Sequence, residues 1–160
     1  PADVADEITG VFNENIWRDG KIIDEDQEFT HLLISRRLKH VFNSSGQQLS
    51  KLQEKGTTNY AYMHPTDLDS LGIQSGELIE IKGAYGMLVG VAEAAKDIKP
   101  GVISMAHAWG DIPGNWGEVR QKGASTNRLI DDHKTYDKIT GQPRMTAIPV
   151  NLRRVPEEVA

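Results

Sequence analysis

The residues best suited to chemistry lie in a short basic segment, Ser35 to His40. It places two arginines and a lysine directly after a β-rich run, in a chain whose net charge is −5. The following Asn43-Ser44-Ser45 adds amide and hydroxyl donors. Arginine guanidinium groups bind phosphate oxygens through paired hydrogen bonds. The segment therefore suits a polyanionic, hydrogen-bonding ligand, although a solvated basic turn that pairs with acidic residues explains it about equally well.

A second set of candidates lies in and after residues 107–126, a segment with two of the three tryptophans and four glycines. Long segments without regular structure are usually functional or disordered, and tryptophans argue against disorder. Trp109 and Trp116 can stack on a ring or simply cover the core. Asn127 and Asp131 can read the donors and acceptors of a heterocycle, although asparagine is more often a cap or turn residue.

Other chemistries find little support in the sequence. The five histidines contain no pair at i, i+2 or i+4, so they do not form a metal motif. Ser104 and Ser125 lack the G-x-S-x-G setting of a nucleophile elbow, and neither GxGxxG nor GxxxxGK[ST] occurs. The chain has no cysteine, which excludes thiolate metal sites and a thiolate-bound iron–sulfur cluster within it. We therefore expect no catalytic residue and no metal ligand in this chain.

Length and charge limit the classes of partner. The 160 residues suit one domain, and a net charge of −5 argues against binding to nucleic acid or an anionic membrane. No apolar run approaches the roughly 20 residues of a membrane span, and the start lacks the form of a signal peptide. We expect a soluble protein, with the cytoplasm favoured and the periplasm open. The first residue is not Met, which indicates an excised domain or a mature fragment.

The elements that must position these residues are mainly strands. Residue types and alternation predict strands at 29–34, 59–63, 78–82, 87–95, 102–106 and 145–152, with Pro149 at an edge or bulge. Residues 78–82 alternate as a half-buried strand does, and Gly83 and Gly86 predict a hairpin after them. Pro65 and Gly72 predict a one-turn helix between them, capped by His64 or Thr66.

The two ends are expected to pack less tightly. Residues 1–28 form an acidic lead-in that packs loosely or belongs partly to a preceding domain, with a solvated linker at 24–28. Residues 156–160 are expected to be a frayed tail.

Four blocks in fixed order carry a family resemblance. They are LLISRRLKHVFNSS (32–45), MHPTDLDSLGIQSGELIEIKGAYG (63–86), IKPGVISMAHAWG (98–110) and the segment 124–150 from ASTNRLIDD to TGQPRMTAIPV. Together they resemble the C-terminal dinucleotide-binding domain of the molybdopterin oxidoreductases, the group that includes formate dehydrogenases and dimethyl sulfoxide reductase. The resemblance runs from about residue 29 to residue 153.

The resemblance implies a mainly β fold, a double-psi β-barrel over residues 29–155 with short helices and a long functional loop. It implies molybdopterin guanine dinucleotide as the ligand, with molybdenum or tungsten held by a residue of another domain. Two positions depart from formate dehydrogenase-like members, which tend to have histidines where this chain has Val41 and Asn43. The residues expected at the cofactor are Ser35, Arg36, Arg37, His40, Asn43, Ser44, Ser45, Asn127, Gly141 and Gln142.

The function implied is that of a cofactor-holding domain in a larger oxidoreductase, inactive on its own. Its partners are then the remaining domains of that enzyme and the nucleotide-type cofactor. One alternative is an adaptor module of the same barrel type that grips proteins and binds no cofactor. A self-cleaving pyruvoyl enzyme is disfavoured because the chain has no Gly-Ser bond. The substrate, and the choice between molybdenum and tungsten, stay open.

Overall fold

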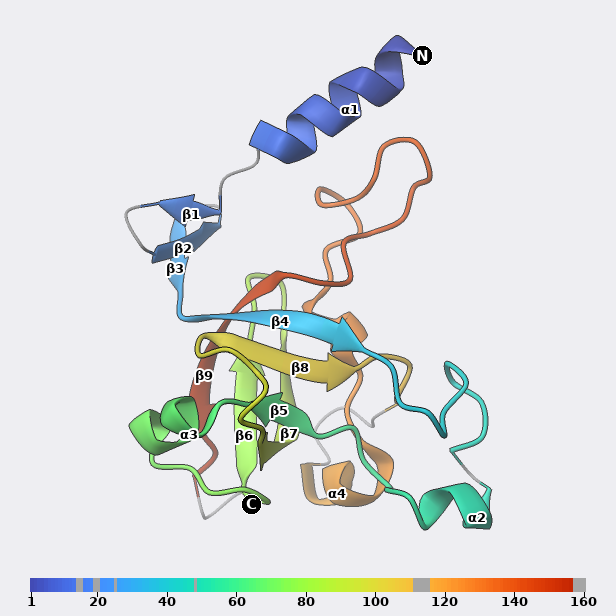
Figure 1. The fold of residues 1–160 in the computed structure, drawn as a ribbon, viewed down its shortest axis with the longest axis vertical. Coiled ribbons are helices and arrows are strands. Elements are labelled where there is room, and N and C mark those ends of the chain that lie inside the picture. Colours follow the sequence, from blue (N-terminus) through green and yellow to red (C-terminus); the bar gives the residue numbers. More distant parts are fainter. Residues whose placement is uncertain (14–15, 19–20, 25, 48, 111–115, 157–160) are drawn as a thin grey trace.

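Six strands close into a barrel in the order β4-β8-β5-β7-β6-β9 (Figure 1). The computed structural model describes residues 1–13, 16–18, 21–24, 26–47, 49–110 and 116–156. This architecture confirms the mainly β barrel fold that the sequence predicts. The barrel strands are β4 (His31–Arg36), β5 (Ala61–Met63), β6 (Leu78–Lys82), β7 (Met87–Ala94), β8 (Val102–Ala106) and β9 (Ile148–Arg154).

Two parallel pairs determine where the functional segments leave the barrel. Strand β4 runs parallel to β8, with Arg36 opposite Ala106, and β5 runs parallel to β7. The remaining neighbours are antiparallel, including β4 with β9. Because β4 and β8 run in the same direction, the segments after Arg36 and Ala106 begin at the same end of the barrel (Figure 1).

The barrel interior is filled by aliphatic side chains. The largest of those less than 2% exposed, among the described residues, are Leu33, Met63, Ile79, Ile81, Ile103, Met105, Leu129 and Val150. The half-buried alternation expected for 78–82 is wrong, because Leu78, Ile79, Glu80 and Ile81 are all buried. Glu80 tolerates burial because Arg153 of β9 binds its carboxylate through two nitrogens, at 2.6 and 2.7 Å.

The short helix between strands forms as predicted. It is α3 (Pro65–Leu71), with proline at its first position. The ring of His64 accepts a hydrogen bond from the Thr66 backbone N–H at 3.2 Å, which satisfies one of the free donors at the helix start. Gly72 ends the helix in the left-handed conformation, at φ 62°.

Pro149 lies where β9 has a single neighbour. It stands opposite Leu32 of β4, whereas β6 pairs with β9 only from Asn151 to Arg154. A proline cannot donate to a second ladder, so this position accommodates it.

The predicted boundaries of several strands shift. The first barrel strand begins at His31 and includes Ser35 and Arg36, which the sequence placed in a turn. The strand expected from residue 59 begins at Ala61, and the one expected from residue 145 begins at Ile148.

The N-terminal segment is more ordered than expected. A three-stranded sheet of β1 (Trp17–Arg18), β2 (Lys21–Asp24) and β3 (Gln27–Phe29) replaces the linker predicted at 24–28. Its formation follows from apolar pairing, because Ile22 lies opposite Phe29 and both side chains are buried. Helix α1 (Ala2–Asn13) has no buried residue and projects away from the barrel (Figure 1). Residues 157–160 of the expected tail lie outside the described residues.

The segment 107–126 also contains regular structure. It includes the 3₁₀ helix η1 (Trp116–Glu118) and α4 (Val119–Lys122), and η2 (Thr126–Leu129) follows. The expectation of a segment without regular structure is therefore wrong for these parts, while residues 111–115 lie outside the described residues. A further short helix, α2 (Ser50–Gln53), falls within the polar stretch before β5.

Candidate functional site

The two adjacent arginines lie at the end of β4 and help to line one small pocket. The Arg36 guanidinium stacks on the ring of Tyr62, 4.1 Å from its centroid. Arg37 donates from Nη1 to Oδ1 of Asn43 at 2.6 Å. Within the described part of the chain, neither arginine forms an ion pair with a carboxylate. The pocket is lined by Arg36, Arg37, Leu38, Val41, Asn43, Ala106, His107 and Trp109.

The turn that carries Asn43 is held by its own backbone. Phe42 and Ser45 exchange hydrogen bonds at 3.2 and 2.8 Å, so Asn43 and Ser44 form the tip of the turn. Asn43 has a φ of 51°, a left-handed conformation that asparagine tolerates better than most residues. Asn43, Ser44 and Ser45 are all exposed. The turn thus presents amide and hydroxyl groups beside Arg37.

Two buried polar atoms lack a hydrogen-bond partner among the residues that the structure describes. They are Nε1 of Trp109, a pocket-lining residue whose side chain is 5% exposed, and Nε2 of His40, which lies in the segment that supplies Leu38 and Val41 to the lining. Native proteins rarely leave such groups unpaired, and an unmet donor beside a cavity is a feature expected where a ligand completes the bonding. With the two arginines, this donor set fits a cofactor that carries phosphates and a polar heterocycle.

Ser35 connects the arginine segment to a distant part of the sequence. Its hydroxyl donates to the carbonyl oxygen of Met145 at 2.5 Å, and its backbone N–H donates to Oγ1 of Thr146 at 3.2 Å. The Ser35 proton is therefore engaged, and its oxygen can still accept a hydrogen bond. This contact places the segment before β9 beside the end of β4.

Asn127 lies on η2 with its side chain exposed. The backbone of η2 packs on the β6–β7 hairpin so closely that a Cβ on Gly86 would clash with the carbonyl of Arg128. No hydrogen bond joins Asn127 to Arg36 or Arg37 within the described part of the chain. The segment before Asn127 is linked instead to the end of β8, beside the arginines, because Asn59 donates hydrogen bonds to the carbonyls of both Ala106 and Ala124.

Gly141 and Gln142 lie in another loop, where they close a turn that begins at Asp137. The Asp137 backbone N–H donates to Gln142, and Gly141 donates back to Asp137, each at 2.8 Å. The loop contacts α1 through Lys138, whose backbone N–H lies 3.5 Å from Oε1 of Glu7. Both predicted residues are exposed, and the structure places them on this loop rather than in the arginine pocket.

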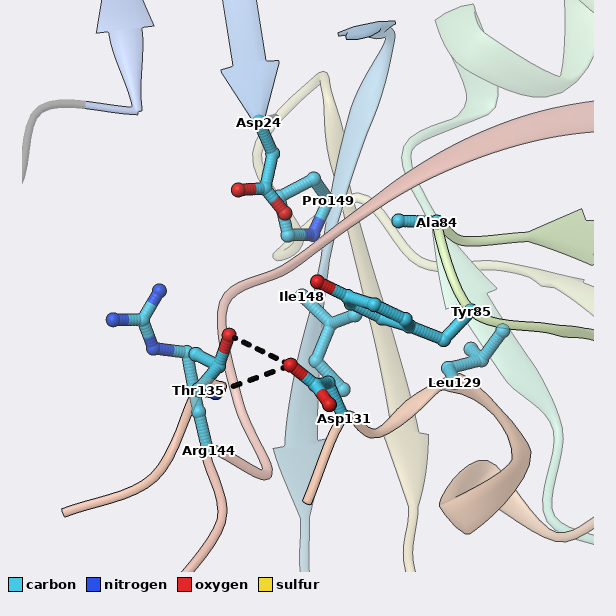
Figure 2. Close-up of a pocket in the computed structure, with 9 residues that line it drawn as sticks. All are labelled: Asp24, Ala84, Tyr85, Leu129, Asp131, Thr135, Arg144, Ile148 and Pro149. Atoms are coloured by element: carbon cyan, nitrogen blue, oxygen red, sulfur yellow. Dashed lines mark hydrogen bonds between the residues drawn. The ribbon is translucent and has the colours of Figure 1, made fainter. Parts of the chain in front are cut away.

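A second pocket lies beside η2 (Figure 2). Figure 2 shows the ring of Tyr85 between Asp24 and Asp131, with Arg144 and Thr135 at one side. Burial opposes ionisation of Asp131, but hydrogen bonds from backbone N–H groups, including that of Thr135 at 3.1 Å, outweigh it and lower its pKa. Asp131 thus supports the start of the 131–146 segment. The residues that line this second pocket are Asp24, Ala84, Tyr85, Leu129, Asp131, Thr135, Arg144, Ile148 and Pro149.

The sequence interpretation missed several residues at these sites. Tyr62, Asn59 and Thr146 contact the functional segments only because distant strands meet, and their sequence neighbours give no sign of it. Arg144 carried one usable signal, since it is a further arginine next to the predicted residues Gly141 and Gln142. Trp116 lies in η1, and its side chain is outside the described part of the structure.

One family matches most of the chain. Residues 32–149 match the family described as Molydopterin dinucleotide binding domain. The chain belongs to this family. Its ligand is accordingly a molybdopterin-type cofactor, which agrees with the unpaired donors around the arginine pocket. The resemblance inferred from the four sequence blocks is confirmed.

Known relatives of this molybdopterin dinucleotide-binding domain are much longer proteins. The chain is 26% identical over 128 residues to dopamine dehydroxylase from Eggerthella lenta, and equally to an uncharacterized oxidoreductase from a strain of that species. These matches cover 77% of this chain and 12% of each relative. Acetylene hydratase from Pelobacter acetylenicus has the same fold, with a TM-score of 0.66 and 21% identity over 79% of this chain and 18% of that one.

The described residues offer neither a metal-binding cluster nor a membrane-spanning helix. No group of three or more His, Cys, Asp or Glu side chains there is arranged to hold a metal ion. No helix in the same residues has both the length and the apolar character that a membrane crossing requires.

Proposed function

We propose that this domain holds molybdopterin guanine dinucleotide inside a larger molybdenum- or tungsten-containing oxidoreductase. When bound, the cofactor supplies the redox chemistry at its metal, and the domain supplies binding, orientation and exclusion of water. The metal ligand and any iron–sulfur cluster then belong to other domains. The small share of each relative that the chain covers supports this division.

The observation that carries the proposal is the pair of arginines at the end of β4. Arg36 and Arg37 engage only a neutral ring and a neutral amide within the described residues. Two guanidinium groups without carboxylate partners suit the pyrophosphate of a dinucleotide. Trp109, whose Nε1 has no partner in the described part of the chain, supplies a further donor in the same pocket.

The remaining candidates take secondary roles in this proposal. Asn43, Ser44 and Ser45 donate to phosphate or guanine, and His40 offers its buried Nε2. Ser35 holds the neighbouring backbone and accepts a hydrogen bond. Asn127 and the Gly141-Gln142 loop would help to hold the pterin part of the cofactor.

Titration with GDP, the nucleotide half of the cofactor, tests the proposal directly. We expect the 160-residue chain to bind GDP more tightly than ADP or CDP, measured by isothermal titration calorimetry. Arg36→Ala and Arg37→Ala should each weaken GDP binding about 10-fold or more, since a hydrogen bond to a charged group contributes roughly 1.5–3 kcal/mol. Arg154→Ala serves as the control, because Arg154, on β9, pairs with Glu77 and does not line the arginine pocket. Equal affinity for all three nucleotides would contradict the guanine form.

The adaptor alternative makes the opposite prediction. A protein-binding barrel has no need of unpaired arginines at a pocket, so GDP binding would be absent. Absence of GDP binding, with correct folding shown by circular dichroism, would favour that alternative.

We also expect the chain alone to show no turnover. It would lack the metal ligand and the rest of the cofactor pocket. Oxidation or reduction of a substrate by the isolated chain would contradict this.

A further inference from the structure

Three consecutive side chains before β5 bind the backbone of the segment that leads to Asn127. Thr57 Oγ1 donates to the carbonyl of Arg120 at 2.9 Å, and Thr58 Oγ1 donates to that of Val119 at 2.7 Å. Oδ1 of Asn59 accepts a hydrogen bond from the backbone N–H of Ala124, two residues after the end of α4. Residues 57–59, here called the clamp, therefore hold α4 and the residues after it against the barrel.

Asn59 is the centre of the clamp. Its side chain is buried, at 1% exposed, and its amide group is fully engaged. Nδ2 donates to the carbonyls of Ala106 at 2.7 Å and Ala124 at 2.9 Å, and Oδ1 accepts from the Ala124 N–H at 2.8 Å. One side chain thus joins the end of β8 to the segment three residues before Asn127.

Gly123 extends this contact to the arginine pocket. A Cβ at Gly123 would lie 2.5 Å from Asn59 Oδ1 and 2.7 Å from the ring of Trp109, so all three are in close contact. Trp109 lines the pocket together with Arg36 and Arg37. The clamp is therefore connected to the pocket through Gly123 and Trp109, and to η2 through Ala124.

We propose that Asn59 is a positioning residue of the cofactor site, which sets Trp109 and Asn127 relative to the two arginines. This rests on the proposed function, since it concerns the same cofactor. Asn59 is buried and does not line the pocket; it fixes the backbone at Ala106 and at Ala124. Groups that bind a ligand lose affinity when their supporting residues no longer hold them in place.

Replacement of Asn59 by leucine, which is of similar size and cannot form hydrogen bonds, tests the proposal. We expect Asn59→Leu to raise the Kd for GDP by about 10-fold at a temperature where the protein is fully folded. The core variant Val91→Ala lies in β7, and its affinity should stay within about two-fold of the wild type. Both variants lower stability, so the comparison separates positioning from general destabilisation.

A second readout follows Trp109 itself. With Trp17 and Trp116 changed to phenylalanine, acrylamide quenching reports Trp109 alone. We expect Asn59→Leu to increase this quenching, and Val91→Ala to leave it unchanged. Thr58→Val removes a single clamp bond, and should weaken GDP binding about three-fold if Asn59→Leu does not fold.

The outcomes distinguish the two proposals. If the wild type binds GDP and both clamp variants bind it within two-fold with unchanged quenching, the role of Asn59 is wrong while the proposed function stands. If the folded wild type binds no GDP, the proposed function itself is wrong, and the positioning role is withdrawn with it.

Discussion

Ser35 and Met145 are joined by a 2.5 Å hydrogen bond, although 110 residues separate them in the chain. The bond connects the last residues of β4 to the segment that leads into β9. As a result, the arginine pocket and the residues just before β9 lie at the same end of the barrel.

Loss of the Ser35 hydroxyl should loosen this connection. Ser35→Ala leaves the Met145 carbonyl without its partner, so we expect the free energy of unfolding to fall by about 1 kcal/mol. Urea denaturation measures the change. Ser44→Ala, at an exposed position, is the matched control and should change stability by less than about 0.5 kcal/mol. A similar result for both variants would contradict the structural role of the bond.

A positive charge at position 37 should not be enough for full GDP affinity. Arg37→Lys keeps the positive charge but loses the planar fork, so we expect GDP binding to weaken about five-fold. Arg154→Lys, on β9, should leave the affinity unchanged. Calorimetric titration at two salt concentrations measures both effects. If lysine restored full affinity, Arg37 would act as a simple point charge.

Gly123 should be intolerant of a side chain. Its φ is 69°, and a Cβ would press against Asn59 and Trp109. We expect Gly123→Ala to lower the free energy of unfolding by about 2–4 kcal/mol through backbone strain and overpacking. Gly10→Ala, in α1 with nothing within 4 Å of the added Cβ, should not lower stability, because alanine favours a helix more than glycine does. Urea denaturation of the two variants provides the comparison.

For the ion pair of Glu80 and Arg153, removing one partner should cost more stability than removing both. The Glu80 side chain is 6% exposed and that of Arg153 is 70% exposed. Arg153→Ala leaves a buried carboxylate without its partner, and we expect a loss of about 2–4 kcal/mol. The double variant Glu80→Leu with Arg153→Ala removes both charges and should recover most of this loss. Failure of the double variant to recover would mean that the pair contributes through packing.

His31 should make stability depend on pH. Its burial lowers its pKa below the ordinary value of 6.5, and nearby Asp67, 3.6 Å from Nε2, offsets this only in part. The unfolded chain therefore binds a proton more readily than the folded protein does. The contribution of His31 to the free energy of unfolding is therefore fully present above about pH 6.5 and is lost as the pH drops below that value.

Urea denaturation between about pH 7.5 and pH 5 tests this linkage. His31→Gln should flatten the dependence in that range, whereas His133→Gln, at an exposed position, should not. An unchanged pH dependence in His31→Gln would assign the effect to other groups.

Much of the barrel could be predicted from local signals. The Pro65 and Gly72 boundaries of α3, and the hairpin at Gly83 and Gly86, depend on residues that act within a few positions of themselves. The order of the strands was available only through the family resemblance, because parallel pairing of β4 with β8 joins residues about 70 positions apart.

The parts that could not be predicted depend on long-range contacts. Asn59 looks like the first residue of a strand, and its role emerges only when Ala106 and Ala124 meet it. The burial of Glu80 depends on Arg153, and the sheet at Trp17–Phe29 depends on the pairing of Ile22 with Phe29 in an acidic stretch. In each case the decisive partner is chosen by the tertiary fold rather than by local propensity.

The pairing of β4 with β9 has a consequence for synthesis on the ribosome. Chains emerge N-terminus first, so β8 can pair with β4 before synthesis is complete, but β9, the strand that closes the barrel on the other side of β4, is made more than a hundred residues after β4. We therefore expect the barrel to stay open, and unable to load its cofactor, until Ile148–Arg154 has left the exit tunnel. Nascent chains stalled before β9 should be cleaved readily by protease, and resistance at that stage would contradict this expectation.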